Sequence, residues 1–240
     1  MHVNHFFSIF TVINISKMKG IRIVLLIAIF SLTALSCLEQ KDRLVTVKGA
    51  LSHLGGTDLY ITYTDTQFKR VNDTIHSSMS GKFYFKLRTY NDLAPITIYF
   101  KEKKCWTTLF AEPGDHITVR GNIESVDLLT IRGGQVNNDL NRFKMQIRNL
   151  YQERLDLLKG TYTKEDASEV RMAEINLQLK RAAKDFISEN PSSIASVILI
   201  QDFFYQEYDP NTSELLGLLK DNASNCHLAE KIRDGISKRR

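Results

Sequence analysis

The hydrophobic period of this sequence changes once, at Gly133-Gly134. Before this pair, apolar and polar residues alternate, as Phe83, Phe85 and Leu87 do with the polar or aromatic residues between them. After it, apolar residues recur at the spacing of one helical face. A period of two suits a strand with one buried face, and a period of about 3.6 suits an amphipathic helix. The two periods in succession predict an α+β fold.

The segment 44–134 is predicted to be an antiparallel β-sandwich-like domain. Its alternating runs are separated by turns rich in Gly, Pro and Asp, such as Ser80-Gly81 and Glu112-Pro113-Gly114-Asp115. Strict alternation implies one buried and one wet face, which is typical of antiparallel sheets. The expected strands are Leu44–Lys48, Leu59–Tyr63, Lys82–Arg88, Ile96–Lys101, His116–Arg120 and Leu128–Arg132.

The segment 135–240 is predicted to be an all-α region. Thr163 is expected to cap a helix while Asp166 reaches back to it in a capping box. Asn190-Pro191 is expected to supply the N-cap and first position of a more apolar helix. The expected helices are Asn138–Lys159, Thr163–Ser188, a third from Asn190 that ends before Asp209-Pro210, and two short ones from about Thr212 and His227.

Residues 1–36 have the features of a signal peptide, and Met18 is the expected true start. The basic segment Met18-Lys19-Gly20-Ile21-Arg22 precedes an apolar run that begins at Ile23. This run has roughly a dozen residues, within the length of a signal sequence and short of the ~20 residues that span a bilayer. It therefore predicts export rather than a permanent membrane helix.

Ala34-Leu35-Ser36-Cys37 is similar to a lipobox, in which a small residue precedes the cysteine that receives the lipid. Leu35 stands one place later than usual. Acylation at Cys37 would leave 37–43 as a lipidated tether and the membrane as a partner, with the protein in the cell envelope. The expected location is the outer membrane, on its periplasmic side or surface. An ordinary secretory signal with a chance cysteine is the alternative.

Charge argues against nucleic acid as a partner. The first 36 residues hold three basic and no acidic residues, so the remaining chain has 29 basic and 27 acidic residues. No run of Lys and Arg with interleaved aromatic residues follows the signal peptide.

The motifs of common enzymes and cofactor sites are absent from the sequence. No C-x-x-C pair, G-x-S-x-G, P-loop or G-x-G-x-x-G is present, and the histidines have no H-x-x-x-H or H-x-H spacing. Cys105 and Cys226 are expected to be separate thiols, with a disulfide between them as the alternative. His116 and His227 are expected to lie at the surface or at a helix start. We therefore expect no catalytic residue, metal site or cofactor.

Four aromatic residues, Tyr60, Tyr84, Tyr99 and Trp106, are predicted to form an exposed strip if their strands are neighbours. Such a strip is suited to binding a glycan or a peptide. The alternative is that the helical region docks on this face and covers it.

Five short motifs follow the lipobox in a defined order. They are Val45-Thr46-Val47-Lys48-Gly49, Asp73-Thr74-Ile75, Gly81-Lys82-Phe83-Tyr84-Phe85, Pro113-Gly114-Asp115-His116-Ile117, and the Gly-Gly-x-x-Asn-x-x-Leu segment from Gly133 to Leu140. This order resembles the N-terminal domain of unknown function of Bacteroidetes thioredoxin-like lipoproteins, associated with AhpC/TSA domains, over nearly all of 38–240.

In those proteins a thioredoxin-like domain with a Trp-Cys-x-x-Cys motif follows the helices, whereas this sequence reaches Arg240 without a counterpart. The resemblance therefore implies the domain but not its redox activity. Asp73-Thr74-Ile75 also resembles the O-glycosylation acceptor of extracytoplasmic Bacteroidetes proteins, which makes Thr74 a candidate acceptor. A threonine at a strand entry is the alternative.

Two functions remain. The first is a non-catalytic envelope lipoprotein that acts as a binding or scaffolding module. The second is the front part of a split or truncated thiol-disulfide oxidoreductase lipoprotein, with a separate thioredoxin-like protein as its partner.

Overall fold

The structure, a computed structural model, describes residues 44–89, 93–160 and 165–238. The predicted signal peptide (1–36), the tether with Cys37, and the capping box of Thr163 with Asp166 lie outside what it describes. Within the described ranges, no helix is both long enough and apolar enough to cross a membrane.

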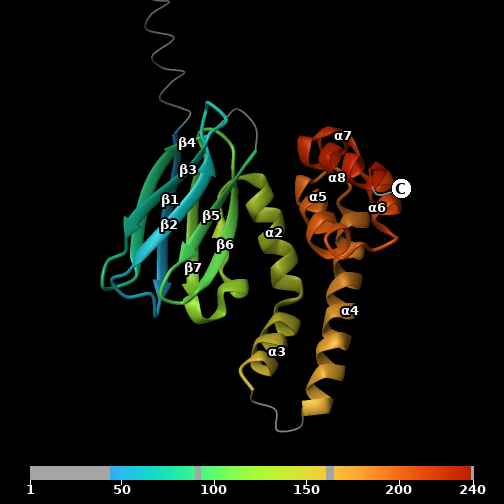
Figure 1. Cartoon of the computed structure of the whole chain (residues 1–240), viewed down its shortest axis with the longest axis horizontal. Coiled ribbons are helices and arrows are strands. Elements are labelled where there is room, and N and C mark those ends of the chain that lie inside the picture. The colour runs from blue at the N-terminus through green and yellow to red at the C-terminus, as the bar shows by residue number, and fades with distance from the viewer. Residues whose placement is uncertain (1–43, 90–92, 161–164, 239–240) are drawn as a thin grey trace, which may run out of the picture. The chain divides into compact units, whose positions relative to one another are not determined.

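The fold is α+β, with two four-stranded sheets followed by helices (Figure 1). Sheet A has the strand order β4-β1-β7-β8, and sheet B has the order β3-β2-β5-β6. A 3-10 turn, η1 (Ile123–Leu128), connects β7 to β8. The strands are β1 (Leu44–Ser52), β2 (Asp58–Thr64), β3 (Arg70–His76), β4 (Lys82–Arg88), β5 (Ala94–Phe100), β6 (Cys105–Ala111), β7 (His116–Asn122) and β8 (Thr130–Arg132).

Strand direction differs from the expectation at one place in sheet A. β1 and β7 are parallel, with Lys48 opposite Thr118, whereas the pairs β2–β3, β2–β5, β5–β6 and β7–β8 are antiparallel. The expectation of a wholly antiparallel domain was therefore wrong for this pair. Alternation reports which face of a strand is buried and carries no information on the direction of its neighbour.

Two strands of sheet B, β3 and β6, lie outside the expected strand ranges, although a strand was expected at Trp106, which is in β6. β3 has the sequence RVNDTIH and contains only half-buried and exposed residues. It is an edge strand, so neither of its faces needs to be apolar, and its alternation is correspondingly weak.

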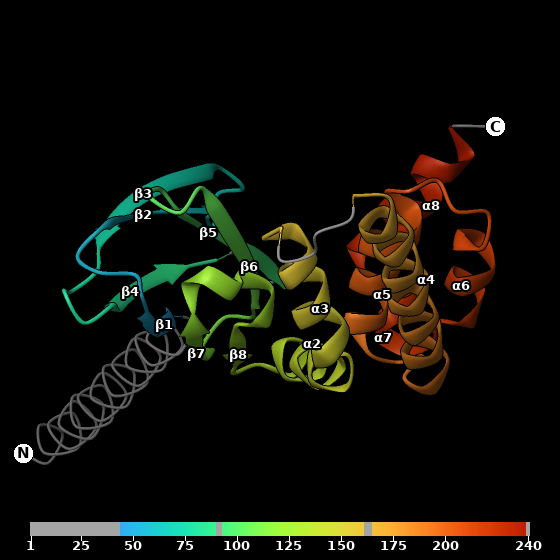
Figure 2. The same ribbon diagram turned by 90° about the horizontal axis from the view of Figure 1, so that it is seen from below.

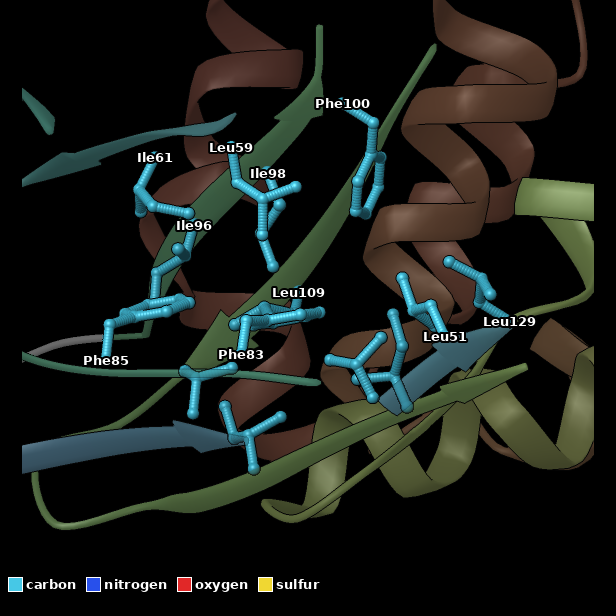
Figure 3. Close-up of a cluster of buried hydrophobic side chains, with 14 of the residues drawn as sticks. Leu51, Leu59, Ile61, Phe83, Phe85, Ile96, Ile98, Phe100, Leu109 and Leu129 are labelled. Carbon is cyan, nitrogen blue, oxygen red and sulfur yellow. The ribbon is translucent and has the colours of Figure 1, made fainter. Parts of the chain in front are cut away.

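The core of the sandwich lies between the two sheets. The inward side chains of both sheets are almost completely buried, and they point toward one another in Figure 3. Gly49 of β1 leaves room for the ring of Phe83, because a Cβ at this position would lie 1.9 Å from the ring. The largest buried members are Leu51, Leu59, Ile61, Ile96, Ile98, Phe100, Leu109, Ile117, Ile123 and Leu129.

The helices form a second hydrophobic core, which includes Phe143, Phe186 and Ile200. The helices are α2 (Gln135–Gln146), α3 (Arg148–Leu158), α4 (Glu165–Glu189), α5 (Ile194–Ile200), α6 (Thr212–Leu218), α7 (Asp221–Asn225) and α8 (His227–Ser237), and a π-helical turn, η2 (Gln201–Tyr205), continues α5.

Two helix boundaries differ from the sequence prediction. The single helix expected over 138–159 is divided into α2 and α3 at Ile147, whose backbone has φ −108° and ψ 17°. No Pro or Gly marks this break, so the sequence pattern continues through it. Asn190 does not cap α5, because its backbone and side-chain N–H groups both donate to the Phe186 carbonyl at the end of α4. Ser193 is the N-cap of α5, and α7 was not expected at all.

α2 is attached to the edge of sheet B through Asn137. Its amide accepts a hydrogen bond from Phe110 N at 2.9 Å and donates to the carbonyls of Phe110 and Gly133. Asn137 is buried, so these bonds are shielded from water. They satisfy the backbone groups that β6, as an edge strand, presents at Phe110.

α2 is also attached to α5 through a buried carboxylate. Asp139 accepts hydrogen bonds from Ser193 Oγ at 2.6 Å and from Gln135 Nε2 at 3.0 Å, and Arg142 lies 3.2 Å from it. One helix therefore makes buried polar contacts with both the sandwich and the remaining helices.

Candidate binding cleft

Three aromatic side chains lie in one row on the outer face of sheet B. The strand register places Tyr60 opposite Tyr99, and Tyr99 opposite Trp106. The rings of Tyr60 and Tyr99 are nearly parallel, with an interplanar angle of 14° and centroids 6.2 Å apart. Trp106 is 63% exposed. We call Tyr60, Tyr99 and Trp106 the aromatic row.

Hydroxyl groups form the next row of the same face. Thr62 is paired with Thr97, and Thr97 with Thr108, whose hydroxyl lies 3.3 Å from that of Thr97. The Thr62 hydroxyl donates to Asn72 Oδ1 at 2.8 Å. Flat aromatic surface and hydroxyl groups therefore alternate along the middle of this face.

Tyr84 does not belong to the aromatic row. It lies on β4, in sheet A, where the ammonium groups of Lys48 and Lys86 approach its ring to 5.9 and 5.8 Å. The condition for a four-residue strip, that the strands are neighbours, is met by three of the residues and not by Tyr84. Alternation alone could not reveal this, because Tyr84 points outward like the others but from the opposite sheet.

Thr74, the candidate O-glycosylation acceptor, is exposed on β3 directly opposite Tyr60. Its backbone N–H donates to Asp73 Oδ1 at 2.7 Å. A glycan at Thr74 would begin at the end of the aromatic row.

The outer face of sheet B is one wall of a cleft of about 1740 Å³. Thr97, Trp106 and Thr108 line it from the sheet side. Residues of α2, α5, η2, α7 and α8 line it from the helical side, so the helices border this face without covering Trp106. The volume is larger than the ~300–1,000 Å³ typical of small-molecule pockets and is sufficient for an oligomeric ligand.

Four titratable side chains, one from the η1 turn of the sandwich and three from the helices, lie close together in this cleft. We call Asp127, Lys144, Tyr151 and Asp202 the cleft cluster; all four line the cleft. Among the described residues, no side chain forms a hydrogen bond or ion pair with any of them. Their donors and acceptors are therefore available to a ligand.

The protein around the cleft changes the acidity of three of these groups. Desolvation lowers the pKa of Lys144, although Asp127 and Asp202 oppose this effect. Desolvation also raises the pKa of Tyr151 to about 12. The pKa of Asp202 is raised from 3.8 to about 6 by desolvation, against the effect of Lys144, even though its side chain is open to the cleft.

The cleft cluster was not predicted from the sequence. Its members come from η1, α2, α3 and η2, so no sequence spacing connects them. One signal was present, because Asp202 is the single charged residue in a largely apolar helical segment from Ile194 to Phe204. The π-helical turn that holds Asp202 has the i→i+5 bond from Gln206 N to the Gln201 carbonyl. Turns of this kind are frequent at functional sites.

The two cysteines of the described part of the chain are free thiols. Cys105 begins β6, and Cys226 immediately precedes α8. Burial and the nearby Asp127 raise the pKa of the Cys105 thiol, which makes it a weaker nucleophile at neutral pH. This does not favour thiol-disulfide chemistry at Cys105.

The histidines lie where the sequence pattern predicts them. His116 is exposed on β7, and His227 is the first residue of α8. Within 44–89, 93–160 and 165–238, no three His, Cys, Asp or Glu side chains are grouped so that they could hold a metal ion.

Comparison with known proteins found no matching family, no similar curated protein and no similar solved structure. The resemblance to the lipoprotein N-terminal domain therefore stays a prediction from the sequence motifs, and the function is argued from the cleft.

Proposed function

We propose that this chain is a non-catalytic lipoprotein of the cell envelope, anchored through Cys37, that binds a saccharide in the cleft beside sheet B. The observation that carries the proposal is the aromatic row: three aromatic side chains in register on the outer face of sheet B, of which Trp106 lines the cleft and the half-buried Tyr60 and Tyr99 continue the row beyond it. An aromatic surface that extends into a cleft is suited to ligand binding.

A saccharide suits this face better than an extended peptide. Peptides commonly bind a sheet by adding a strand to its edge. At Phe110, the edge of sheet B formed by β6 is already occupied by Asn137. The face of the sheet offers aromatic rings for the apolar face of a sugar and threonine hydroxyls for its polar groups.

The cleft cluster supports the same ligand class. A sugar hydroxyl both donates and accepts a hydrogen bond, so it complements an ammonium group and a carboxylate equally well. Lys144 and Asp202 supply these two groups without forming an ion pair with each other.

Among the described residues, the cleft cluster lacks the hydrogen-bonded pair that activates a nucleophile in covalent catalysis. Nucleophilic catalysis requires a nucleophile and a base within hydrogen-bond reach of each other. No such bond joins any two members of this cluster among the described residues.

Intrinsic fluorescence tests the proposal directly, because Trp106 is the single tryptophan of the chain. The mature chain from Leu38 would be titrated with soluble gluco-, manno-, galacto- and xylo-oligosaccharides, and with short peptides of similar size. We expect at least one oligosaccharide to shift the Trp106 emission. A Tyr60→Ala/Tyr99→Ala double variant should bind it about tenfold more weakly or worse, equivalent to about 1.4 kcal/mol.

Tyr84→Ala is the matched control, because it removes an exposed tyrosine from the opposite sheet. It should bind the oligosaccharide like the wild type. Binding of peptides alone, or equal loss in the Tyr84 variant, would contradict the proposal.

The anchor has a separate test. Replacement of Cys37 by Ser should move the protein from the membrane fraction to the soluble fraction of the envelope. Retention of the Cys37→Ser variant in the membrane fraction would argue against acylation at this residue.

A further inference from the structure

The outer face of sheet A collects basic side chains from three parts of the sequence. Its four strands contain no Asp or Glu. Six exposed cations point outward from them, and we call these residues the basic face. They are Lys48, Lys82, Lys86, Arg88, Arg120 and Arg132.

Strand pairing brings these cations together. In the register of β1, β7 and β8, Lys48 is opposite Thr118, which is opposite Arg132. Arg120 lies in the next outward row of β7. On the other side of β1, the ring of Tyr84 lies between the ammonium groups of Lys48 and Lys86, at 5.9 and 5.8 Å. The cations therefore extend across the whole sheet.

Within the described part of the chain, no acidic side chain is paired with a cation of the basic face. Elsewhere the chain does pair its cations, as Arg171 with Glu153 at 2.6 Å and Lys180 with Asp209 at 3.0 Å. Six unpaired cations on one face, in a mature chain that is nearly neutral, favour an anionic partner.

We propose that the basic face binds the anionic headgroups of the membrane that anchors the chain. This inference rests on the lipid anchor of the proposed function. Six residues separate Cys37 from β1, and such a segment extends at most about 20 Å. The tether therefore holds β1, which carries Lys48 itself, close to the lipid surface, where clustered Lys and Arg are attracted to anionic headgroups.

The orientation that follows suits the proposed ligand site. Sheets A and B lie on opposite sides of one core, so their outer faces are directed away from each other (Figures 2 and 3). With the basic face on the membrane, the aromatic row is directed away from it, toward a ligand in the surrounding space.

Vesicle co-sedimentation of the unacylated mature chain from Leu38 tests this proposal independently of the anchor and of the saccharide site. The vesicles are phosphatidylcholine alone, or phosphatidylcholine with about one third phosphatidylglycerol. We expect binding to the anionic vesicles only, with release by high salt, because charges beyond the Debye length are screened.

The test variant neutralises four cations of the basic face, and the control variant neutralises two Lys and two Arg that are exposed in the helical region. The test variant should bind anionic vesicles about tenfold more weakly or worse, and the control like the wild type. The test substitutions are Lys48→Gln, Lys86→Gln, Arg120→Gln and Arg132→Gln, and the control substitutions are Arg148→Gln, Lys159→Gln, Arg181→Gln and Lys220→Gln.

Three results would overturn the proposal: no binding to anionic vesicles, equal binding to neutral vesicles, or equal loss in both variants. A heparin-binding assay distinguishes a membrane from a soluble polyanion as the partner. Retention on heparin without vesicle binding would assign the basic face to a soluble polyanion instead of a membrane. Because Trp106 is in the other sheet, its emission separates a failure of this proposal from a failure of the saccharide site.

Discussion

The two sheets of the sandwich share one core but have opposite kinds of outer face. Sheet A presents the basic face, with six exposed cations and a single tyrosine among them. Sheet B presents the aromatic row and three threonines, and it borders a cleft. The inward residues of both sheets are similar, since any strand of a sandwich must bury an apolar face. The two sheets therefore differ in their outward residues, which core packing does not constrain, and these residues form the proposed membrane-binding and saccharide-binding surfaces.

Substitution of the residue that attaches α2 to the edge of sheet B should have the greatest effect on stability. Replacement of Asn137 by Ala removes its bonds to Phe110 and Gly133 and leaves buried backbone groups without partners. We expect the free energy of unfolding to fall by about 3 kcal/mol, measured by urea denaturation.

Asn138→Ala is the control for this variant. Asn138 is exposed and accepts one hydrogen bond, from Gly133 N at 3.2 Å, so its loss should cost about 1 kcal/mol or less. Equal effects of the two substitutions would mean that Asn137 does not hold α2 to sheet B.

A smaller effect concerns Asp202, on the wall that faces sheet B. Its pKa is raised to about 6, so the folded protein binds the proton more tightly than the unfolded chain does. Protonation of Asp202 therefore stabilises the fold fully below about pH 4, and this contribution is lost as the pH rises through 6. Asp202→Asn removes the ionised form. At pH 8 it should stabilise the protein by about 1 kcal/mol, a value reduced for the solvent exposure of the side chain.

The same variant should have no effect on stability near pH 4, which thermal unfolding at the two pH values would reveal. Asp185→Asn, at an exposed carboxylate of α4, should change stability little at either pH. A stabilisation of Asp202→Asn that is independent of pH would exclude titration as its cause.

The aromatic row also predicts a coupling within sheet B. A double-mutant cycle of Tyr60→Ala and Tyr99→Ala should give a coupling free energy of about 0.5–1 kcal/mol, because the two rings form a cross-strand pair. Urea denaturation of the two single variants and the double variant measures it. Additive effects would show that the rings do not stabilise each other.

The smallest expected effect is the equivalent coupling in sheet A. Lys48 lies 5.9 Å from the Tyr84 ring, and both side chains are exposed. A cycle of Lys48→Ala and Tyr84→Ala should give about 0.5 kcal/mol or less. A coupling free energy larger than that between Tyr60 and Tyr99 would contradict the expectation that the outward side chains of sheet B interact more strongly than those of sheet A.

Strands with regular alternation of apolar and polar residues were predicted well from the sequence. The edge strand β3 and the break between α2 and α3 were not. The pattern around Phe83, Phe85 and Leu87 predicted β4, because those side chains must enter the core. β3 escaped prediction because it is a mostly exposed edge strand. The break at Ile147 escaped because no Gly or Pro marks the boundary between α2 and α3.

The candidate site was predicted only in part, because a local pattern does not show which strands and helices are neighbours. Tyr60, Tyr99 and Trp106 were expected to share a face, and the register of β2, β5 and β6 brings them together. Tyr84 was grouped with them because it also points outward, but it belongs to the other sheet. The cleft cluster and the basic face consist of residues far apart in the sequence, so a search for contiguous motifs does not find them.

The change from strands to helices at Gly133-Gly134, and the buried side of most strands, could be predicted from the sequence. Both follow from local periodicity, which shows which face of a strand or helix is apolar. Three other features are visible only in the folded structure: which strands are neighbours, the parallel pairing of β1 and β7, and the position of α2 at the edge of β6 near Phe110. These are relations between segments distant in the chain, and they arise from packing around a shared core and from the buried bonds of Asn137.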